Sequence, residues 1–160
     1  MRSSLLLCGT SEIALDDKGR LAVPARYREI LKDECCGECV ITRSLFDPCL
    51  WLYPKTEWEV AAAALSALPS LTDELCRSLQ RLLLGSAVYV KMDGQSRILL
   101  PQELRSAGSI SKKAVLIGMQ NKFELWSEEI LQQQRSRDIQ MIADERATLL
   151  SHPELKNLKL

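Results

Sequence analysis

The chain has 160 residues, of which 46% are hydrophobic and 26% are charged, and its formal net charge is zero. This balance is typical of a globular protein with one ordinary domain or two small ones, and it excludes both a disordered chain and a polycation. No apolar run approaches the roughly 18 residues of a membrane span, and "SLLLC" is too short for a signal-peptide core, so we expect a cytoplasmic protein.

The first half of the chain predicts four short strands and three helices. The strands are expected at "SEIAL", "GRLAV", "ECVITRS" and "CLWLY". Pro24 suits the first turn of a helix in "PARYREIL", because its fixed φ fits there and its missing N–H is not needed. Pro54 opens the helix "PKTEWEVAAAALSAL", and "SLTDELCRSLQRLLLG" predicts a third helix with Ser70 or Thr72 as its N-cap.

The second half repeats this order. Strands are expected at "AVYVKM", "RILL", "AVLIGM" and "KFELW", with a short proline-initiated helix at "PQELRSAG". A long polar helix follows at "SEEILQQQRSRDIQMIADERATLL". Its later half carries an apolar stripe at Ile139, Ile142, Ala143, Leu149 and Leu150.

A thirteen-residue segment occurs twice, as "DDKGRLAVPARYR" at residues 16–28 and "DGQSRILLPQELR" at residues 93–105. Four residues match at a constant offset of 77 positions (93 − 16): Asp16 with Asp93, Arg20 with Arg97, Pro24 with Pro101 and Arg28 with Arg105. Four matches in register within so short a window indicate an internal duplication.

The duplication extends beyond this segment, because "LWLYPKTEW" corresponds to "FELWSEEIL". Tyr53 then lies opposite Trp126 at an offset of 73 (126 − 53), so we expect the second copy to have lost four residues between its short helix and its strands. A few short strands bury little apolar surface alone, so the two units are expected to share one α+β core around a pseudo-two-fold axis. The expected domains are a first repeat with a helical extension (1–85), a second repeat with a C-terminal helix (86–150) and a tail (151–160).

Positive charge concentrates around both copies of the segment. Residues 18–32 hold five bases and one acid, residues 91–113 hold five bases and two acids, and residues 33–90 hold four bases and eight acids. This distribution favours an anion-binding face, although scattered solvated surface charge would give the same count.

The cysteines give little sign of a metal or redox site. One CxxC pair, Cys36 and Cys39, has only the isolated Cys49 nearby, and the single His152 lies near the far end of the chain. A zinc site usually needs a second pair of ligands. We therefore expect no metal and no cofactor, and interpret the cysteines as small buried or turn residues.

An acid and an arginine four residues apart across a tight turn can form a charge-assisted pair. Such a pair could simply pin the turn, but an exposed pair contributes only about 0–1 kcal/mol. The alternative is that Asp16 orients Arg20, and Asp93 orients Arg97, so that each guanidinium points at phosphate or at a base edge. Lys18 would add a phosphate contact that its counterpart Gln95 cannot supply.

Two further positions in the segments differ between the copies. Gly19 permits either a positive φ or the close approach of a ligand. Ser96 stands at the corresponding place in the second copy. The first copy is therefore expected to be the better adapted of the two and the principal DNA contact.

The duplicated segments, with proline four residues after each arginine, resemble the MraZ family of the SpoVT–AbrB superfamily of DNA-binding proteins. The resemblance implies two half-repeats that form a swapped-hairpin, barrel-like β core with surrounding helices. It also implies a nucleoid-associated transcriptional regulator, chiefly a repressor, of the division and cell wall gene cluster. Such regulators form ring-shaped homo-oligomers and bind short G-containing direct repeats in duplex DNA at their own promoter. The DNA-binding residues implied are Asp16, Arg20, Asp93 and Arg97.

The sequence departs from this family in two places. Ser96 replaces a glycine common in the second motif, and the opening "MRSSLLLCGTSE" differs from the family's short aromatic–Gly start. The resemblance implies neither a membrane nor a small-molecule substrate.

Two other classes of function remain as alternatives. Paired Asp and Arg residues and a CxxC could belong to an enzyme, but no Gly-rich phosphate loop, zinc pair or His beside a nucleophile is found. A self-assembling or antitoxin-like interaction module could use its aromatic residues and its long polar helix at interfaces. The aromatic residues concerned are Trp51, Tyr53, Trp58 and Trp126, which are more often core.

Overall fold

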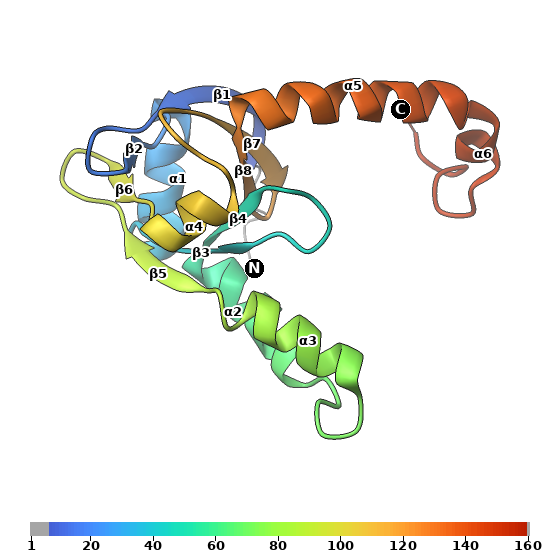
Figure 1. Ribbon diagram of the computed structural model, residues 1–160, viewed down its shortest axis with the longest axis horizontal. Coiled ribbons are helices and arrows are strands. Elements are labelled where there is room, and N and C mark those ends of the chain that lie inside the picture. The colour runs from blue at the N-terminus through green and yellow to red at the C-terminus, as the bar shows by residue number, and fades with distance from the viewer. Residues whose placement is uncertain (1–6, 160) are drawn as a thin grey trace. The chain divides into compact units, whose positions relative to one another are not determined.

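The computed structural model describes residues 7–159. Most of the "SLLLC" run, the first six residues of the expected first repeat and the last residue of the expected tail lie outside the described residues. The described chain divides into two compact units, one ending at Glu128 and one beginning at Glu129 (Figure 1). Within residues 7–159, no helix is both long enough and apolar enough to cross a membrane.

Residues 7–159 contain eight strands. They are β1 (Leu7–Ala14), β2 (Arg20–Ala22), β3 (Glu38–Arg43), β4 (Leu50–Pro54), β5 (Val88–Lys91), β6 (Arg97–Leu99), β7 (Lys113–Gln120) and β8 (Phe123–Ser127). All eight strands expected from the sequence are present. Together with the helices they confirm the α+β class and the two repeats.

The helices are α1 (Ala25–Cys35), α2 (Lys55–Ser66), α3 (Glu74–Leu83), α4 (Gln102–Ala107), α5 (Glu128–Asp144) and α6 (Arg146–Ser151). Two expected details of their N-termini were wrong. Pro24 is the N-cap of α1, with an extended ψ of 139°, and does not lie in the first turn. Asp73, rather than Ser70 or Thr72, caps α3, because its carboxylate accepts hydrogen bonds from the backbone N–H groups of Leu75 and Cys76.

The strands of the two repeats are interleaved in a symmetric order. The six-stranded antiparallel sheet runs β1-β7-β8-β4-β3-β5, and β2 pairs with β6 in a separate ladder. Exchanging each strand for its counterpart in the other repeat (β1 for β5, β3 for β7, β4 for β8) gives the order β5-β3-β4-β8-β7-β1. This is the same sheet taken from its opposite edge. The first strand of each repeat therefore pairs with the other repeat, and neither repeat completes its sheet alone.

The register places the pseudo-two-fold axis between particular residues. Leu21 faces Ile98 in the β2–β6 ladder, and these two residues are related by the repeat offset of 77 (98 − 21). Trp51 faces Glu124 in the β4–β8 pair, and they are related by the offset of 73 (124 − 51). Residues that are equivalent by sequence meet at both places, as a two-fold axis through the core requires.

The four residues missing from the second copy are lost in two places, which corrects the expectation of one. Ala14 pairs with Lys113 and Lys91 pairs with Glu38, so Glu38 and Lys113 are equivalent at an offset of 75 (113 − 38). Two residues are thus missing between the short helix and β7. The other two are missing from the turn between β7 and β8, which is shorter than the loop between β3 and β4.

The sheet packs on both faces because alternate residues of a strand point to opposite sides. Ile41 and Leu52 face the larger core, which also contains residues of the β2–β6 ladder, α1 and α4. Their neighbours Val40 and Tyr53 face the other way and pack with Trp58 of α2. The β2–β6 ladder that carries both Asp–Arg turns therefore packs on the main core through Leu21 and Ile98.

The second unit consists of α5 beyond its first residue, α6 and the following residues. The long helix expected to reach residue 150 is interrupted at Glu145, where φ is −99° and ψ is 24°. The apolar stripe is exposed: Ile139 is 71% exposed and Ile142 is 58% exposed.

Candidate nucleic-acid interface

The first turn is built around the carboxylate of Asp16. Oδ1 accepts hydrogen bonds from the backbone N–H of Lys18 (3.0 Å) and of Arg20 (2.9 Å), while Nε of Arg20 donates to Oδ2 (2.7 Å). The backbone closes the turn, since the N–H of Gly19 donates to the carbonyl of Asp16 at 3.0 Å. One carboxylate thus fixes both the loop and the guanidinium of Arg20.

The second turn has the same construction. Oδ1 of Asp93 accepts from the backbone N–H of Gln95 and of Arg97, both at 2.9 Å, and Nε of Arg97 donates to Oδ2 at 2.9 Å. The N–H of Ser96 donates to the carbonyl of Asp93 at 2.9 Å. The sequence difference at residues 95 and 96 therefore leaves the Asp–Arg geometry unchanged.

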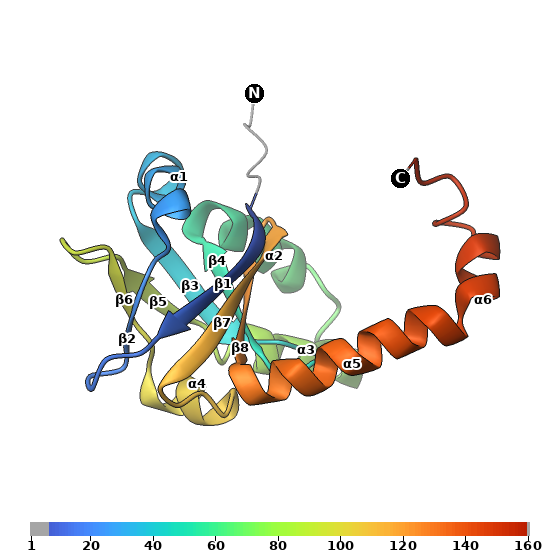
Figure 2. The ribbon, with the colours of Figure 1, turned by 90° about the horizontal axis from the view of Figure 1, so that it is seen from above.

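Backbone hydrogen bonds tie each turn to the other repeat. The N–H of Val23 donates to the carbonyl of Ser96 (2.9 Å), and the N–H of Leu100 donates to the carbonyl of Gly19 (2.9 Å). Both turns project from the same side of the first unit in the two views (Figures 1 and 2). The fold thus gathers two motifs 77 positions apart (93 − 16) into one surface.

Gly19 and Ser96 both adopt the left-handed conformation, with φ of 82° and 59°. Glycine adopts it without cost, whereas a serine there is strained. The sequence suggested that a ligand could approach Gly19 closely. In the structure, the side chain of Arg105 occupies that position. A Cβ added to Gly19 would lie 2.7 Å from Cζ of Arg105.

The side chains of the two motif arginines are partly exposed, 29% for Arg20 and 28% for Arg97. Among the described residues, the Asp–Arg hydrogen bond of each turn uses Nε. The terminal nitrogens are then the donors that can reach an external acceptor such as a phosphate or a guanine edge. Lys18 is exposed beside them, and its counterpart Gln95 is exposed but uncharged.

Both aspartates favour the ionised form. The backbone N–H of Arg20 is the largest of the contacts that lower the pKa of Asp16 below its ordinary value of 3.8, and its side chain adds to the effect. The backbone N–H of Arg97 lowers the pKa of Asp93 in the same way. Each carboxylate is therefore charged at neutral pH and able to orient its arginine.

All six residues singled out in the sequence lie in these two turns: Asp16, Lys18, Gly19, Arg20, Asp93 and Arg97. Two relationships were missed. Arg105 packs against Gly19, and Asp16 lies near Arg97 as well as Arg20. The repeat had already marked Arg105 as a matched position, but spacing gave no sign that its side chain reaches the other repeat.

The two cysteines of the CxxC motif, Cys36 and Cys39, differ in their surroundings. Cys36 is exposed at the left-handed end of α1, and it is Cys35 that lies beside the buried Cys39. A hydrogen bond between these two thiols lowers the pKa of Cys35 and raises that of Cys39. Over residues 7–159 no cluster of three His, Cys, Asp or Glu side chains could hold a metal ion.

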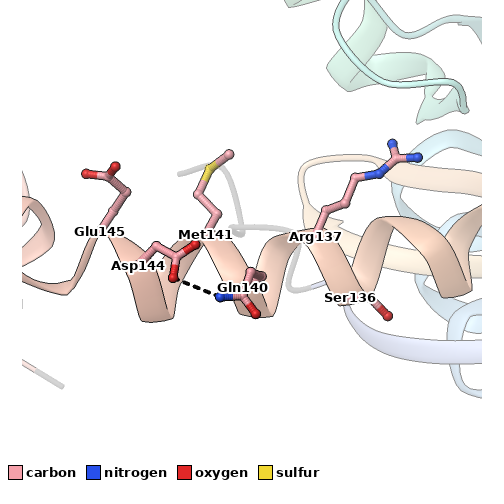
Figure 3. A pocket seen from close by; sticks show the side chains of 6 residues that line it. All are labelled: Ser136, Arg137, Gln140, Met141, Asp144 and Glu145. Atoms are coloured by element: carbon pink, nitrogen blue, oxygen red, sulfur yellow. Dashed lines mark hydrogen bonds between the residues drawn. The ribbon is translucent and has the colours of Figure 1, made fainter.

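A shallow groove of about 790 Å³ runs along α5 in the second unit. Its lining comes from α5 and the residue that follows it: Ser136, Arg137, Gln140, Met141, Asp144 and Glu145. Figure 3 shows Arg137, Met141 and Glu145 projecting to one side, while Gln140 donates to Asp144 at 2.8 Å. An open face with both signs of charge and no converging polar groups does not favour a small-molecule site.

Comparison with known proteins agrees with the duplicated motif. The family model described as "MraZ protein, putative antitoxin-like" matches residues 6–81 and 83–151, so each match contains one Asp–Arg motif. Transcriptional regulator MraZ of Pseudomonas aeruginosa is 49% identical over 121 residues, which cover 76% of this chain and 80% of the relative. The proteins of that name from Pseudomonas putida and Pseudomonas entomophila are 50% identical over the same shares. The chain belongs to the MraZ family.

Proposed function

We propose that this protein is a sequence-specific DNA-binding transcriptional regulator. In this proposal it represses the division and cell wall gene cluster, including its own promoter, by binding direct repeats in duplex DNA as a ring-shaped homo-oligomer. Asp16, Gly19 and Asp93 shape the two turns, and Arg20, Arg97 and Lys18 contact the DNA. The regulator names of the relatives support the general role.

The observation that carries the proposal is the pair of Asp–Arg turns on one side of the first unit. In each turn the carboxylate holds Nε of the arginine at 2.7 Å or 2.9 Å. A held guanidinium presents a planar fork of donors, which suits the two acceptors on the major-groove edge of guanine. An arginine that is already oriented loses less side-chain entropy on binding than a free one.

The charge balance of the surface supports assembly on repeated sites. The two turns carry no net charge of their own, because Asp16, Asp17 and Asp93 offset Lys18, Arg20 and Arg97. One chain therefore neutralises few phosphates, and DNA affinity is low when few phosphates are neutralised. Several chains joined in a ring would meet successive DNA repeats at a high effective concentration.

An exposed apolar face on α3 supports self-association. Leu75 is 70% exposed and Leu82 is 48% exposed, and seven residues separate them, so they lie on the same side of the helix. Exposed leucines on one helix face are characteristic of a surface that another protein covers.

Membership of a family of transcriptional regulators sets the enzyme alternative aside. The words "antitoxin-like" in the family description keep one other candidate open, namely an interaction module without direct DNA readout. Such a module would assemble normally but would show no salt-dependent affinity for DNA.

The test is a fluorescence-anisotropy titration of a labelled duplex from the region upstream of the chain's own gene, at several salt concentrations. A scrambled duplex of the same length is the control. Arg20→Ala is expected to weaken binding to the upstream duplex strongly, and Arg97→Ala to weaken it less. Equal affinities of wild type and Arg20→Ala, or of the two duplexes, would contradict the proposal.

A further inference from the structure

The first turn carries a side chain of the second repeat against its backbone. A Cβ built on Gly19 would lie 2.7 Å from Cζ, 2.9 Å from Nη1 and 3.0 Å from Nε of Arg105. Three atoms of the guanidinium plane at nearly equal distances mean that its flat face, and not its edge, lies over Gly19. Nη2 of the same group donates to Oε1 of Gln102 at 2.9 Å.

The equivalent arginine of the first repeat behaves differently. Nε of Arg28 donates to the carbonyl of Val23 at 2.8 Å. Nε of Arg105 is buried and has no hydrogen-bond partner among the described residues. Leaving a buried donor unpaired costs free energy, so no hydrogen bond of Nε explains the position of Arg105 over Gly19.

The difference between the turns matches the difference in sequence. Gly19 has no Cβ and leaves room for the guanidinium face. Ser96, at the equivalent position, has a Cβ and is strained at a φ of 59°. The absence of a side chain at residue 19 therefore permits a contact across the repeats that the second turn's sequence does not allow in the same form.

We infer that Arg105 is a positioning residue for the first Asp–Arg turn. Its guanidinium lies flat on Gly19 and limits the motion of the peptide that leads into Arg20. The orientation of Arg20 then depends on the second repeat, in addition to Asp16. The effect of Arg105 on DNA binding rests on the proposed function. The contact between Arg105 and Gly19 can be tested without DNA.

The first test is hydrogen–deuterium exchange of the full-length free protein. Arg105→Ala is expected to raise the exchange rate of the segment around residues 16–20 by about tenfold and to leave the segment around residues 93–97 unchanged. Arg28→Ala, the equivalent change in the first repeat, is the matched control and should not affect the first turn. Equal exchange of residues 16–20 in wild type and Arg105→Ala would overturn the inference, whatever the protein does with DNA.

The second test separates positioning from a direct phosphate contact. With the upstream duplex, Arg105→Ala is expected to lower affinity about fivefold, as expected for a misplaced charge-assisted contact. The loss should largely vanish in an Arg20→Ala background and persist in an Arg97→Ala background. Arg105→Lys, which keeps the charge without the planar face, should not restore affinity.

Losses that add fully in both backgrounds, or full rescue by Arg105→Lys, would overturn the positioning role in favour of a charge contact. Gly19→Ser provides an independent variant, because its Cβ would displace the guanidinium. It should lower affinity as Arg105→Ala does, and the two changes combined should cost little more than either alone. Failure of the wild type to bind the duplex would count against the proposed function only, because the exchange experiment decides the inference separately.

Discussion

Oδ2 of Asp16 lies 4.0 Å from Nη1 of Arg97, although the two residues are 81 positions apart (97 − 16). The same oxygen accepts a hydrogen bond from Nε of Arg20 at 2.7 Å. Among the described residues, Asp93 forms an ion pair with Arg97 alone. The two turns are therefore equal in local geometry but unequal in their connections, since one carboxylate lies beside both arginines.

This asymmetry predicts unequal effects of neutralising the two aspartates. Asp16→Asn should lower DNA affinity more than Asp93→Asn, because it loosens Arg20 and weakens the field around Arg97. We expect a difference of about threefold to fivefold, the range for partly exposed ion pairs. Anisotropy titrations of the two variants at one salt concentration measure it. Equal losses would mean that the 4.0 Å approach has no effect on readout.

Much of this arrangement could be predicted from the sequence, because the repeat is visible as spacing. The positions of Asp16 and Arg20 predicted a strand–turn–strand with a charge pair, and the hydrogen bonds confirm that geometry. The pairing of strands between the two repeats was predicted only through the family resemblance, because local sequence patterns do not specify long-range pairing. Contacts such as Arg105 over Gly19 depend on the path of a long side chain, which no spacing rule encodes.

The N-cap of α3 likewise depends on the path of the chain and not on residue type alone. Ser70 and Thr72 are good N-cap residues by type, but Asp73 has the extended backbone and the carboxylate position that reach the first N–H groups. Several residue types are favourable at an N-cap, so sequence alone leaves several candidates. The backbone conformation before the helix determines which of them caps it.

The stability of the protein is predicted to fall in acid through the two turns. The pKa values of Asp16 and Asp93 are lowered in the folded chain, chiefly by the backbone N–H groups of Arg20 and Arg97. Their contribution is therefore present above the ordinary carboxyl pKa of 3.8 and is lost as pH falls through the lower folded values.

Urea unfolding from about pH 5 to about pH 2 measures this dependence. The double variant Asp16→Asn/Asp93→Asn should show a shallower decline in the urea midpoint over that range, because neither group titrates. The same slope in wild type and double variant would show that other carboxylates account for the acid sensitivity.

A buried hydroxyl joins β3 to the end of α3. Oγ1 of the fully buried Thr42 donates to the carbonyl of Leu83 at 2.7 Å. Thr42→Val keeps the volume but leaves that carbonyl without this donor, so it should lower the free energy of unfolding by about 1–3 kcal/mol. Thr42→Ser keeps the hydroxyl and loses one methyl group, at a cost of about 1 kcal/mol. Urea unfolding of both variants decides the matter, and a smaller cost for Val than for Ser would contradict the role of the hydrogen bond.

The exposed leucines of α3 predict which surface supports assembly. Leu75→Glu/Leu82→Glu places two charges on the apolar face, and burying those charges against another subunit would be strongly unfavourable. Glutamate is a good helix former, so α3 should remain folded. Light scattering coupled to size-exclusion chromatography should then show a large fall in mass, while the circular dichroism spectrum stays the same.

Phe46→Glu is the matched control for this experiment, since Phe46 is 85% exposed in the loop between β3 and β4 and lies outside α3. It should leave the assembled mass unchanged. The α3 variant retains both Asp–Arg turns, so its affinity for a duplex with one repeat should equal that of wild type. Its affinity for a duplex with several repeats should fall, because the chains no longer bind as one body. An unchanged mass for the α3 variant would exclude this face from the interface and direct attention to the exposed stripe of α5 at Ile139 and Ile142.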